Sequence, residues 1–176
     1  MNRNWLRVVG RLGLTFGTVY AGFVLLLDPW RYAEADAVTW ALNVVGVDRV
    51  RGGYGNQVLV MPEHHRAFLA SISPSCSALA AVLAFGAIAL FLVRGEPRRR
   101  LVAFAGAAGV VLVCNMVRIA LSIWVGLVTS EHGLTVFHDW VGTAFGLIYV
   151  LGGFTLFLFL LLPSNQQLLK EATNAG

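Results

Sequence analysis

Four long apolar runs constrain this chain more than any other feature of its sequence. They lie at about residues 8–27, 75–93, 101–127 and 139–162. A helix needs about 20 apolar residues to cross the hydrocarbon core of a bilayer, and each run is close to that length. Only 12% of the residues are charged, against about 25% in soluble domains, and the mean hydropathy is +0.72. We therefore predict an all-α polytopic membrane protein with about four transmembrane helices.

The stretch between the first two runs, residues 28–73, is polar and predicts a small structure outside the membrane. Its segment Ala35–Val47 has the pattern of a short amphipathic helix. Two β-prone runs, Gln57–Met61 and Ala67–Ile72, flank a Pro-Glu-His-His turn and predict a β-hairpin. Because the sequence has no internal repeat and no low-complexity linker, we expect residues 1–176 to form a single membrane domain.

The arginines predict the orientation of the chain, because cytoplasmic loops near span ends are rich in Lys and Arg. The N-terminal segment carries Arg3, Arg7 and Arg11, and the loop RGEPRRR at Arg94–Arg100 carries four more, whereas the loop before the last run has none. Both termini and the basic loop are therefore expected in the cytoplasm, beneath a cell (inner) membrane, with the polar insertion on the extracytoplasmic side. The same arginines account for the isoelectric point of 9.6 without a nucleic-acid partner.

Cys76, Arg118 and His138 have predicted depths that place them near the same membrane surface. At a helical rise of about 1.5 Å per residue, Cys76 and Arg118 each lie about 27 Å above the inner ends of their spans. His138 lies about 37 Å above the inner end of the last span and is expected to cap its outer end. Arg118 is the only charge well inside a predicted span, and such charges usually mark functional sites. The alternative is that Arg118 snorkels to the outer headgroups and that the other two residues lie there by chance.

Cys76 stands where the polar insertion meets the second apolar run. Ser73 suits an N-cap and Pro74 suits the first helical position, so Cys76 is predicted in the first turn of a helix. Helix N-termini and neighbouring Arg or His side chains lower the pKa of a cysteine and favour the nucleophilic thiolate. Cys114 lies mid-span among apolar residues and is interpreted as packing. Two cysteines are too few for a disulfide framework.

Three short motifs resemble the exosortase/archaeosortase family, of which this chain looks like a compact, short-chain member. They are SCSAL around Cys76, NMVRI at Asn115–Ile119 and FHDWVG at Phe137–Gly142. Members of this family are polytopic membrane proteins proposed to act as cysteine proteases or transpeptidases on C-terminal sorting signals of exported proteins. The resemblance covers about residues 45–150. The chain departs from the family pattern at Ala78, where Gly is usual, and in its small number of spans.

The resemblance implies that Cys76, Arg118 and His138 form a catalytic set at the extracytoplasmic face. Cys76 would form a thioester with the peptide upstream of the substrate's membrane anchor, with His138 as acid and base and Arg118 stabilising the oxyanion. Water would resolve the thioester in proteolysis, and an amine on a lipid or glycan would do so in transpeptidation. The implied partners are membrane lipids and exported proteins that end in a motif, a transmembrane segment and a basic tail. No cofactor is implied.

Two further residues are supporting candidates. Asn115 lies one helical turn before Arg118 and either orients its side chain or forms a plain interhelical hydrogen bond. Ser77 adjoins Cys76 in the SCSAL motif.

The remaining polar groups near the motifs have their own alternatives. Asp139 adjoins His138 and is a third supporting candidate, but it is expected to point elsewhere on the helix, toward the membrane interface. His132, in the flexible loop SEHG, is the rival base. His64 and His65 lie in the predicted hairpin turn, and zinc would need three or four ligands at fixed geometry. We therefore expect a solvated turn and no metal.

The leading hypothesis is thus a membrane-embedded thiol peptidase or transpeptidase. A second class is a non-catalytic assembly protein or accessory of an export or polysaccharide system, in which Arg118 grips a lipid phosphate. A thiol redox protein is disfavoured because the sequence has no C-x-x-C motif and no second cysteine on the same side. The peptidase hypothesis expects the Sγ of Cys76 to lie within about 4–5 Å of a nitrogen of His138.

Overall fold

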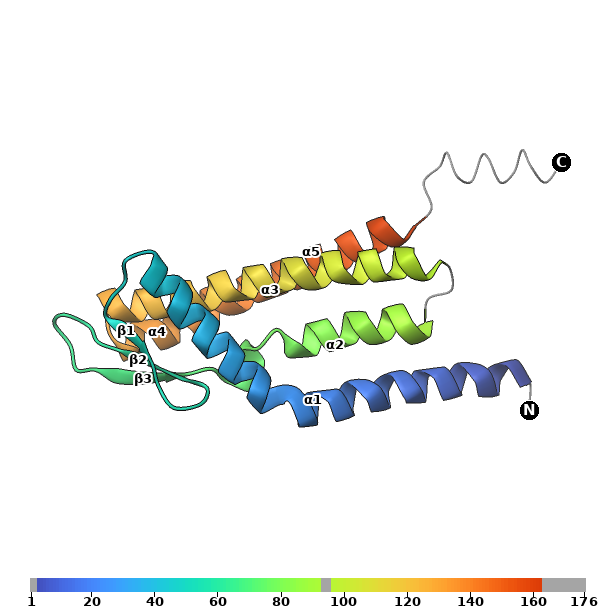
Figure 1. The fold of residues 1–176 in the computed structure, drawn as a ribbon, viewed down its shortest axis with the longest axis horizontal. Coiled ribbons are helices and arrows are strands. Elements are labelled where there is room, and N and C mark those ends of the chain that lie inside the picture. Colours follow the sequence, from blue (N-terminus) through green and yellow to red (C-terminus); the bar gives the residue numbers. More distant parts are fainter. Residues whose placement is uncertain (1–2, 93–95, 163–176) are drawn as a thin grey trace.

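Helices that run side by side make up most of the structure, and a small sheet lies at one end (Figure 1). The computed structural model describes residues 3–92 and 96–162. In chain order the elements are α1 (Arg3–Val44), β1 (Val50–Gly52), β2 (Gln57–Val60), β3 (Phe68–Ser71), a 3₁₀ turn (Pro74–Cys76), α2 (Leu79–Ala87), a π-helical turn (Ile88–Leu92), α3 (Pro97–Val128), α4 (Glu131–Phe137), a second π-helical turn (His138–Gly142) and α5 (Thr143–Leu161). Residues 1–2, 93–95 (including Arg94) and 163–176 lie outside the described residues.

Three helical segments are long and apolar enough to cross a membrane, namely Val8–Val44, Pro97–Val128 and Glu131–Leu161. A fourth apolar helix, Leu79–Phe91, is shorter. It corresponds to the predicted span 75–93, whose first residues belong to the 3₁₀ turn instead. The prediction of an all-α polytopic membrane protein with a small extramembrane sheet is confirmed, with one span shorter than predicted.

α1 is one continuous helix, which corrects the prediction of a span at 8–27 followed by a separate amphipathic helix at 35–47. Pro29 lies inside α1, and a proline bends a membrane helix without ending it when neighbouring groups satisfy the freed backbone. Figure 1 shows α1 changing direction along its length, with the second half crossing α3. The amphipathic pattern itself is confirmed, because Ala35 and Val38 are fully buried on one face of this half.

The predicted hairpin is present as part of a three-stranded antiparallel sheet in the order β1-β2-β3. In the pairing of β2 with β3, Gln57 faces Ser71 and Val60 faces Phe68, close to the predicted runs. β1 was missed because it is only three residues long and lies in the glycine-rich stretch before β2. Gly55 takes the left-handed conformation, with φ of 66°, in the turn that joins them.

Two hydrophobic cores hold the elements together. The sheet core joins the sheet to the second half of α1 and to α3, and the bundle core joins α2, α3 and α5. The sheet core consists of Ala35, Val38, Leu42, Val50, Val58, Val60, Ile72, Cys76, Ile119 and Ile123. The bundle core consists of Ala78, Phe85, Ala89, Ala103, Ala107, Val111, Tyr149 and Phe157.

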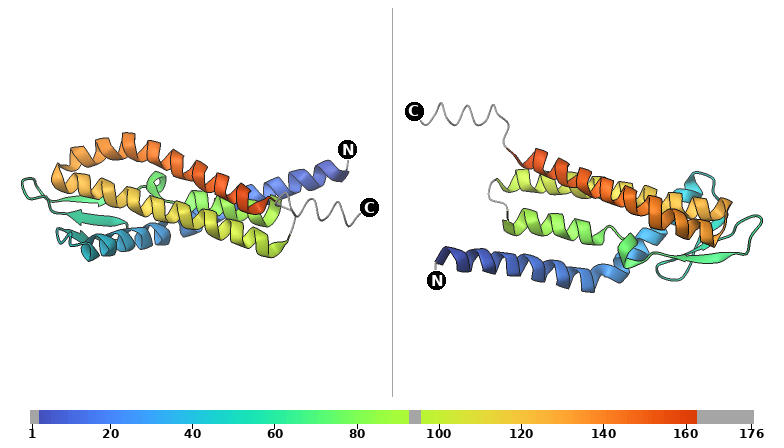
Figure 2. Two further views of the ribbon diagram at one scale, coloured as in Figure 1. Left: turned by 90° about the horizontal axis from the view of Figure 1, so that it is seen from above. Right: turned by 180° about the vertical axis from the view of Figure 1, so that it is seen from behind.

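The two ends of the bundle differ in composition. The start of α1, the end of α2, the start of α3 and the end of α5 lie together at one end, and the sheet with α4 lies at the other (Figures 1 and 2). Arg98, Arg99 and Arg100 occupy the first turn of α3, so this basic cluster lies at the end opposite the sheet.

Candidate active site

Cys76 lies in the short 3₁₀ turn between the sheet and the bundle. This turn covers Pro74–Cys76, and α2 begins only at Leu79. Ser73 makes no capping hydrogen bond, and Ser77 adopts an extended conformation that interrupts the helical path. Cys76 is therefore not in the first turn of an α-helix, which corrects the prediction from the sequence. The N-terminus of α2 does not account for the properties of its thiol.

Cys76, His138 and Arg118 meet at one point although they are far apart in the sequence. The Sγ of Cys76 lies 2.7 Å from Nε2 of His138, and Nη2 of Arg118 lies 3.1 Å from the same nitrogen. Both separations are hydrogen-bonding distances.

A π-helical turn carries His138 inside a helix that starts earlier than predicted. Helical structure is continuous over Glu131–Leu161, so the predicted start at residue 139 is too late. The π turn His138–Gly142 joins α4 to α5, and such turns occur frequently at functional sites because they change which residues a helix presents to its neighbours. His138 is the first residue of this turn.

Asp139 contacts His138, which corrects the expectation that it points elsewhere. Its Oδ1 lies 3.1 Å from Nδ1 of His138. An Nδ1–H that donates to this carboxylate leaves the lone pair of Nε2 free to accept a proton. The side chain of Asp139 is 63% exposed, so water shares the contact. The expectation failed because it considered only the directions of neighbouring side chains on a regular α-helix.

The other histidines occupy exposed positions on other parts of the surface. His132 is on α4 and not in a flexible loop as predicted, because Ser130 caps this helix. His64 and His65 are exposed between β2 and β3. Within the part of the chain that the structure describes, no group of three or more His, Cys, Asp and Glu side chains could hold a metal ion.

The surroundings of Cys76 lower the pKa of its thiol to about 7. Burial acts in the opposite direction and raises the pKa, since it disfavours the charged thiolate. The hydrogen bonds with His138 and with the hydroxyl of Ser73, whose Oγ lies 2.9 Å from Sγ, outweigh burial. Near neutral pH, a substantial fraction of Cys76 is therefore thiolate.

Arg118 is buried between α3 and the π turn, with only 6% of its surface exposed. Gly142 makes this position possible, because a Cβ there would lie 3.1 Å from Nε of Arg118 and 3.7 Å from its Nη2. Among the described residues, Nε has no hydrogen-bond partner. Arginine carries five N–H donors, so this side chain can bind His138 and a further acceptor together.

A buried acid on α1, Glu34, links the segment of the nucleophile to the bundle. Its Oε1 accepts hydrogen bonds from the backbone N–H of Ala78 at 2.9 Å and from Nδ2 of Asn115 at 3.1 Å. The hydroxyl of Tyr149 donates to Oδ1 of Asn115 at 2.9 Å. Asn115 therefore forms interhelical hydrogen bonds, which was one of its two predicted roles; these contacts do not include Arg118.

Glu34 was missed in the sequence because the polar stretch after the first run was read as lying outside the bundle. A usable signal exists, since Glu34 precedes Val38 by four residues and Leu42 by eight and so shares their helical face. An acid on the apolar face of an amphipathic helix is costly to bury without partners. Such an acid therefore predicts hydrogen-bond donors on the surface that this face covers. The sequence around Tyr149 has no comparable pattern that would predict its hydrogen bond with Asn115.

Ser77 and Ala78 connect the nucleophile to α2. The Oγ of Ser77 accepts a hydrogen bond from the N–H of Leu79 at 3.3 Å, so this hydroxyl supports the start of α2. Ala78 is buried in the bundle core. Its methyl group therefore packs against the protein at the position where the family pattern usually has Gly.

Two cavities meet at His138. A groove of about 510 Å³ lies between α2, α3 and α5, and its lining includes Arg118, His138 and Asp139. A smaller cavity of about 40 Å³ lies between the sheet, α3 and α4 and is lined by Cys76, Ile72 and His138, among others. We call the first the α2–α5 groove and the second the thiol cavity.

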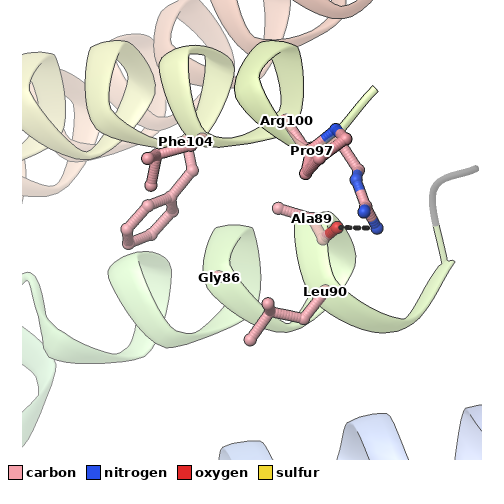
Figure 3. A pocket seen from close by; sticks show the side chains of 7 residues that line it. Gly86, Ala89, Leu90, Pro97, Arg100 and Phe104 are labelled. Carbon is pink, nitrogen blue, oxygen red and sulfur yellow. Dashed lines mark hydrogen bonds between the residues drawn. The ribbon is translucent and has the colours of Figure 1, made fainter. Parts of the chain in front are cut away.

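A third cavity, of about 360 Å³, lies at the other end of α2 (Figure 3). Ala89, Leu90 and Phe104 contribute apolar walls, and Arg100 at its edge donates from Nη1 to the carbonyl oxygen of Ala89 at 3.4 Å. Among the described residues, its lining contains no Cys, His, Asp or Glu. The candidate active site is therefore the cluster around Cys76.

The sequence of the chain matches a known protein family. No curated protein and no solved structure matches the chain. The sequence model of one family, described as transmembrane exosortase (Exosortase_EpsH), matches residues 3–168, which is most of the 176-residue chain. This family acts on exported proteins with C-terminal sorting signals, in a general role of membrane protease or transpeptidase. The chain belongs to the transmembrane exosortase family.

Proposed function

We propose that this protein is a membrane-embedded cysteine peptidase or transpeptidase with Cys76 as its nucleophile. The observation that carries this assignment is the 2.7 Å contact between Sγ of Cys76 and Nε2 of His138. Asp139 on Nδ1 of the same ring orients the imidazole. A thiol, a base within hydrogen-bonding reach and a group that orients the base together meet the requirements of nucleophilic catalysis.

In the first step, the thiol proton passes to Nε2 of His138 and the thiolate attacks the carbonyl carbon of the scissile peptide bond. A C–S bond forms, and the π electrons of the carbonyl move onto its oxygen. When the C–N bond breaks, the imidazolium of His138 gives its proton to the leaving nitrogen. The upstream peptide remains on Sγ as a thioester, and the C-terminal segment departs as an amine.

Arg118 stabilises the oxyanion of this step. Once His138 is protonated, Nη2 of Arg118 and the imidazolium carry like charges 3.1 Å apart, and these repel each other strongly in a buried site. The repulsion favours a shift of the guanidinium toward the developing negative charge. Loss of one oxyanion donor typically lowers the rate by about 10²–10³-fold.

The second step regenerates the thiol. Water, or an amine on a lipid or glycan, attacks the thioester carbonyl while His138 accepts the proton of the attacking group. The C–S bond then breaks and Cys76 leaves as the thiolate. We propose that the substrates are exported proteins that end in a short motif, a transmembrane segment and a basic tail.

We propose that the sheet and the site face the extracytoplasmic side. The positive-inside rule supports this orientation, because Arg98, Arg99 and Arg100 begin α3 at the end opposite the sheet. Exported substrates would then reach Cys76 after crossing the membrane, and both termini would lie in the cytoplasm.

Replacement of Cys76 by Ala in cells tests the proposal. We expect exported substrates to keep their C-terminal segment in Cys76→Ala, which mass spectrometry of the mature proteins detects as a larger mass. Cys114→Ala is the matched control and should process normally, since Cys114 packs at the edge of the bundle core. Normal processing in Cys76→Ala would contradict the proposal and favour an accessory in which Arg118 binds a lipid phosphate.

A further inference from the structure

The α2–α5 groove extends from the catalytic cluster into the apolar part of the bundle. His138 and Asp139 lie at one end of its lining, and Gly146 and Val150 continue along α5. Just over three helical turns separate His138 from Val150, which corresponds to about 18 Å of helix. This stretch belongs to the segment Glu131–Leu161 that is apolar enough to cross a membrane. The groove therefore follows α5 for about three helical turns.

The thiol and the charged groups of the site face different cavities. Cys76 lines the small thiol cavity beside the sheet, whereas Arg118 and Asp139 line the α2–α5 groove. His138 lines both. The base therefore stands between the space that the thiol faces and the space that leads into the bundle.

The chemistry of the proposed first step assigns the two halves of a substrate to opposite sides of His138. The upstream half becomes bonded to Sγ of Cys76 and so belongs on the side of the thiol cavity. The downstream half receives its proton from His138 and becomes an amine, which is charged at neutral pH. The carboxylate of Asp139 lies in the groove and attracts such a cation, so the downstream half belongs there.

We infer that the α2–α5 groove binds the apolar membrane helix of the substrate that follows the scissile bond. This inference rests on the proposed function. The guanidinium of Arg118 supports a peptide occupant. Arg118 lines the groove, and its side chain carries five N–H donors, of which Nη2 contacts His138 at 3.1 Å. A peptide carbonyl at the head of the groove can accept a hydrogen bond from this side chain, whereas the hydrocarbon of a lipid tail cannot.

Small side chains keep the groove open. Ala81 on α2 and Gly146 on α5 both line it. A Cβ at Gly146 would meet the hydroxyl of Tyr149 at 3.8 Å and Cζ of Arg118 at 4.0 Å. A methyl group is therefore tolerated there, and a larger side chain would extend into the groove beside Arg118. These two residues therefore set the width available to a substrate helix.

Small-to-large variants of the full chain test the inference. The probe is the exported protein whose mass changes in Cys76→Ala. In Gly146→Leu and Ala81→Leu we expect its processing to slow by at least about tenfold, since misplacement of a substrate by about 1 Å can cost 10²-fold in rate. Gly152→Leu is the matched control on α5, because a Cβ at Gly152 has no atom within 4 Å, and it should process normally. Alkylation of Cys76 by iodoacetamide should stay within about twofold of the parent rate in all three, because the substitutions leave the thiol's partners in place.

A photo-crosslinking residue at Leu147, in the Cys76→Ala chain, identifies the occupant directly. Leu147 is exposed and lines the groove, so this replacement does not disturb a core and decides the question even if the leucine variants fail to fold. We expect adducts with substrate residues downstream of the cleavage site. Adducts with upstream residues or with lipid alone, or normal processing in both groove variants, would overturn the inference while leaving the role of Cys76 intact. If no exported protein depends on Cys76, the proposed function itself fails, and the inference fails with it.

Discussion

The sheet core and the bundle core are packed in different ways. In the bundle core, Phe85 stacks on Phe157 with ring centroids 5.9 Å apart, and Gly153 lets α5 approach Val111 closely. Around the sheet core, the buried groups include the thiol of Cys76 and the carboxylate of Glu34, each held by hydrogen bonds. Substitutions of groups that contact Cys76, His138 or Arg118 should therefore change catalysis, and substitutions in the bundle core should change stability.

The largest expected effect comes from the base. His138→Ala should lower substrate processing by about 10²–10⁴-fold, the usual contribution of a general acid–base group. It should also move the midpoint of Cys76 alkylation above pH 7, because the hydrogen bond from His138 helps to lower the pKa of this thiol. His132→Ala is the control within the same continuous helix. An equal loss in His132→Ala, or none in His138→Ala, would contradict the assignment of the base.

Much of this molecule could be predicted from the sequence, because apolar length and local motifs report on it directly. The spans follow from hydropathy, and the strands β2 and β3 follow from β-prone runs around a turn. The proximity of Cys76 and His138 was expected from three motifs at similar depth, and the structure places the two in contact. Each of these features was predicted from the apolar length, β-propensity or motif of individual segments.

The features that were missed depend on how segments meet. α1 continues through Pro29, and the half of α1 after Pro29 packs on α3 and the sheet. The contact of Asp139 with His138 arises in a π turn, which has no sequence pattern that helical periodicity would reveal. The role of Glu34 requires knowing that Ala78 and Asn115 lie opposite it.

We expect the next largest effect from replacement of Glu34. This residue connects the two cores through its hydrogen bonds with Ala78 and Asn115. Glu34→Ala would leave the N–H of Ala78 and the amide of Asn115 without their acceptor, and each buried unpaired donor costs about 1–3 kcal/mol. We expect a clearly lower midpoint of thermal unfolding in detergent, together with slower substrate processing. Glu34→Gln keeps an oxygen acceptor and should retain most of both. If the Gln variant is as unstable as the Ala variant, the charge of Glu34 matters rather than its hydrogen bonds.

Two glycines of the last helical segment allow a direct test of the contrast between the candidate active site and the bundle core. In Gly142→Ala the new Cβ would lie 3.1 Å from Nε of Arg118, so processing should fall by about tenfold, since displaced catalytic groups lose rate steeply. In Gly153→Ala the Cβ would lie 2.9 Å from Cγ2 of Val111, and overpacking of this kind costs about 1–3 kcal/mol. Processing assays and thermal unfolding, run on both variants, should separate them. If the two substitutions have equal effects on both measurements, the distinction between the candidate active site and the bundle core is wrong.

The smallest expected effect concerns Ser73, whose hydroxyl contacts the thiol of Cys76. The alkylation rate of Cys76, measured in a Cys114→Ala chain, should rise with pH around a midpoint of about 7, because only the thiolate reacts. Ser73→Ala removes a hydrogen bond that lowers this pKa, so the midpoint should move upward by about one unit or less, one unit being about 1.4 kcal/mol. Ser75→Ala is the matched control, because Ser75 contacts the hydroxyl of Ser73 at 2.8 Å and acts on the thiol only through it. A midpoint that stays at 7 in Ser73→Ala would leave His138 as the residue that lowers the pKa of Cys76.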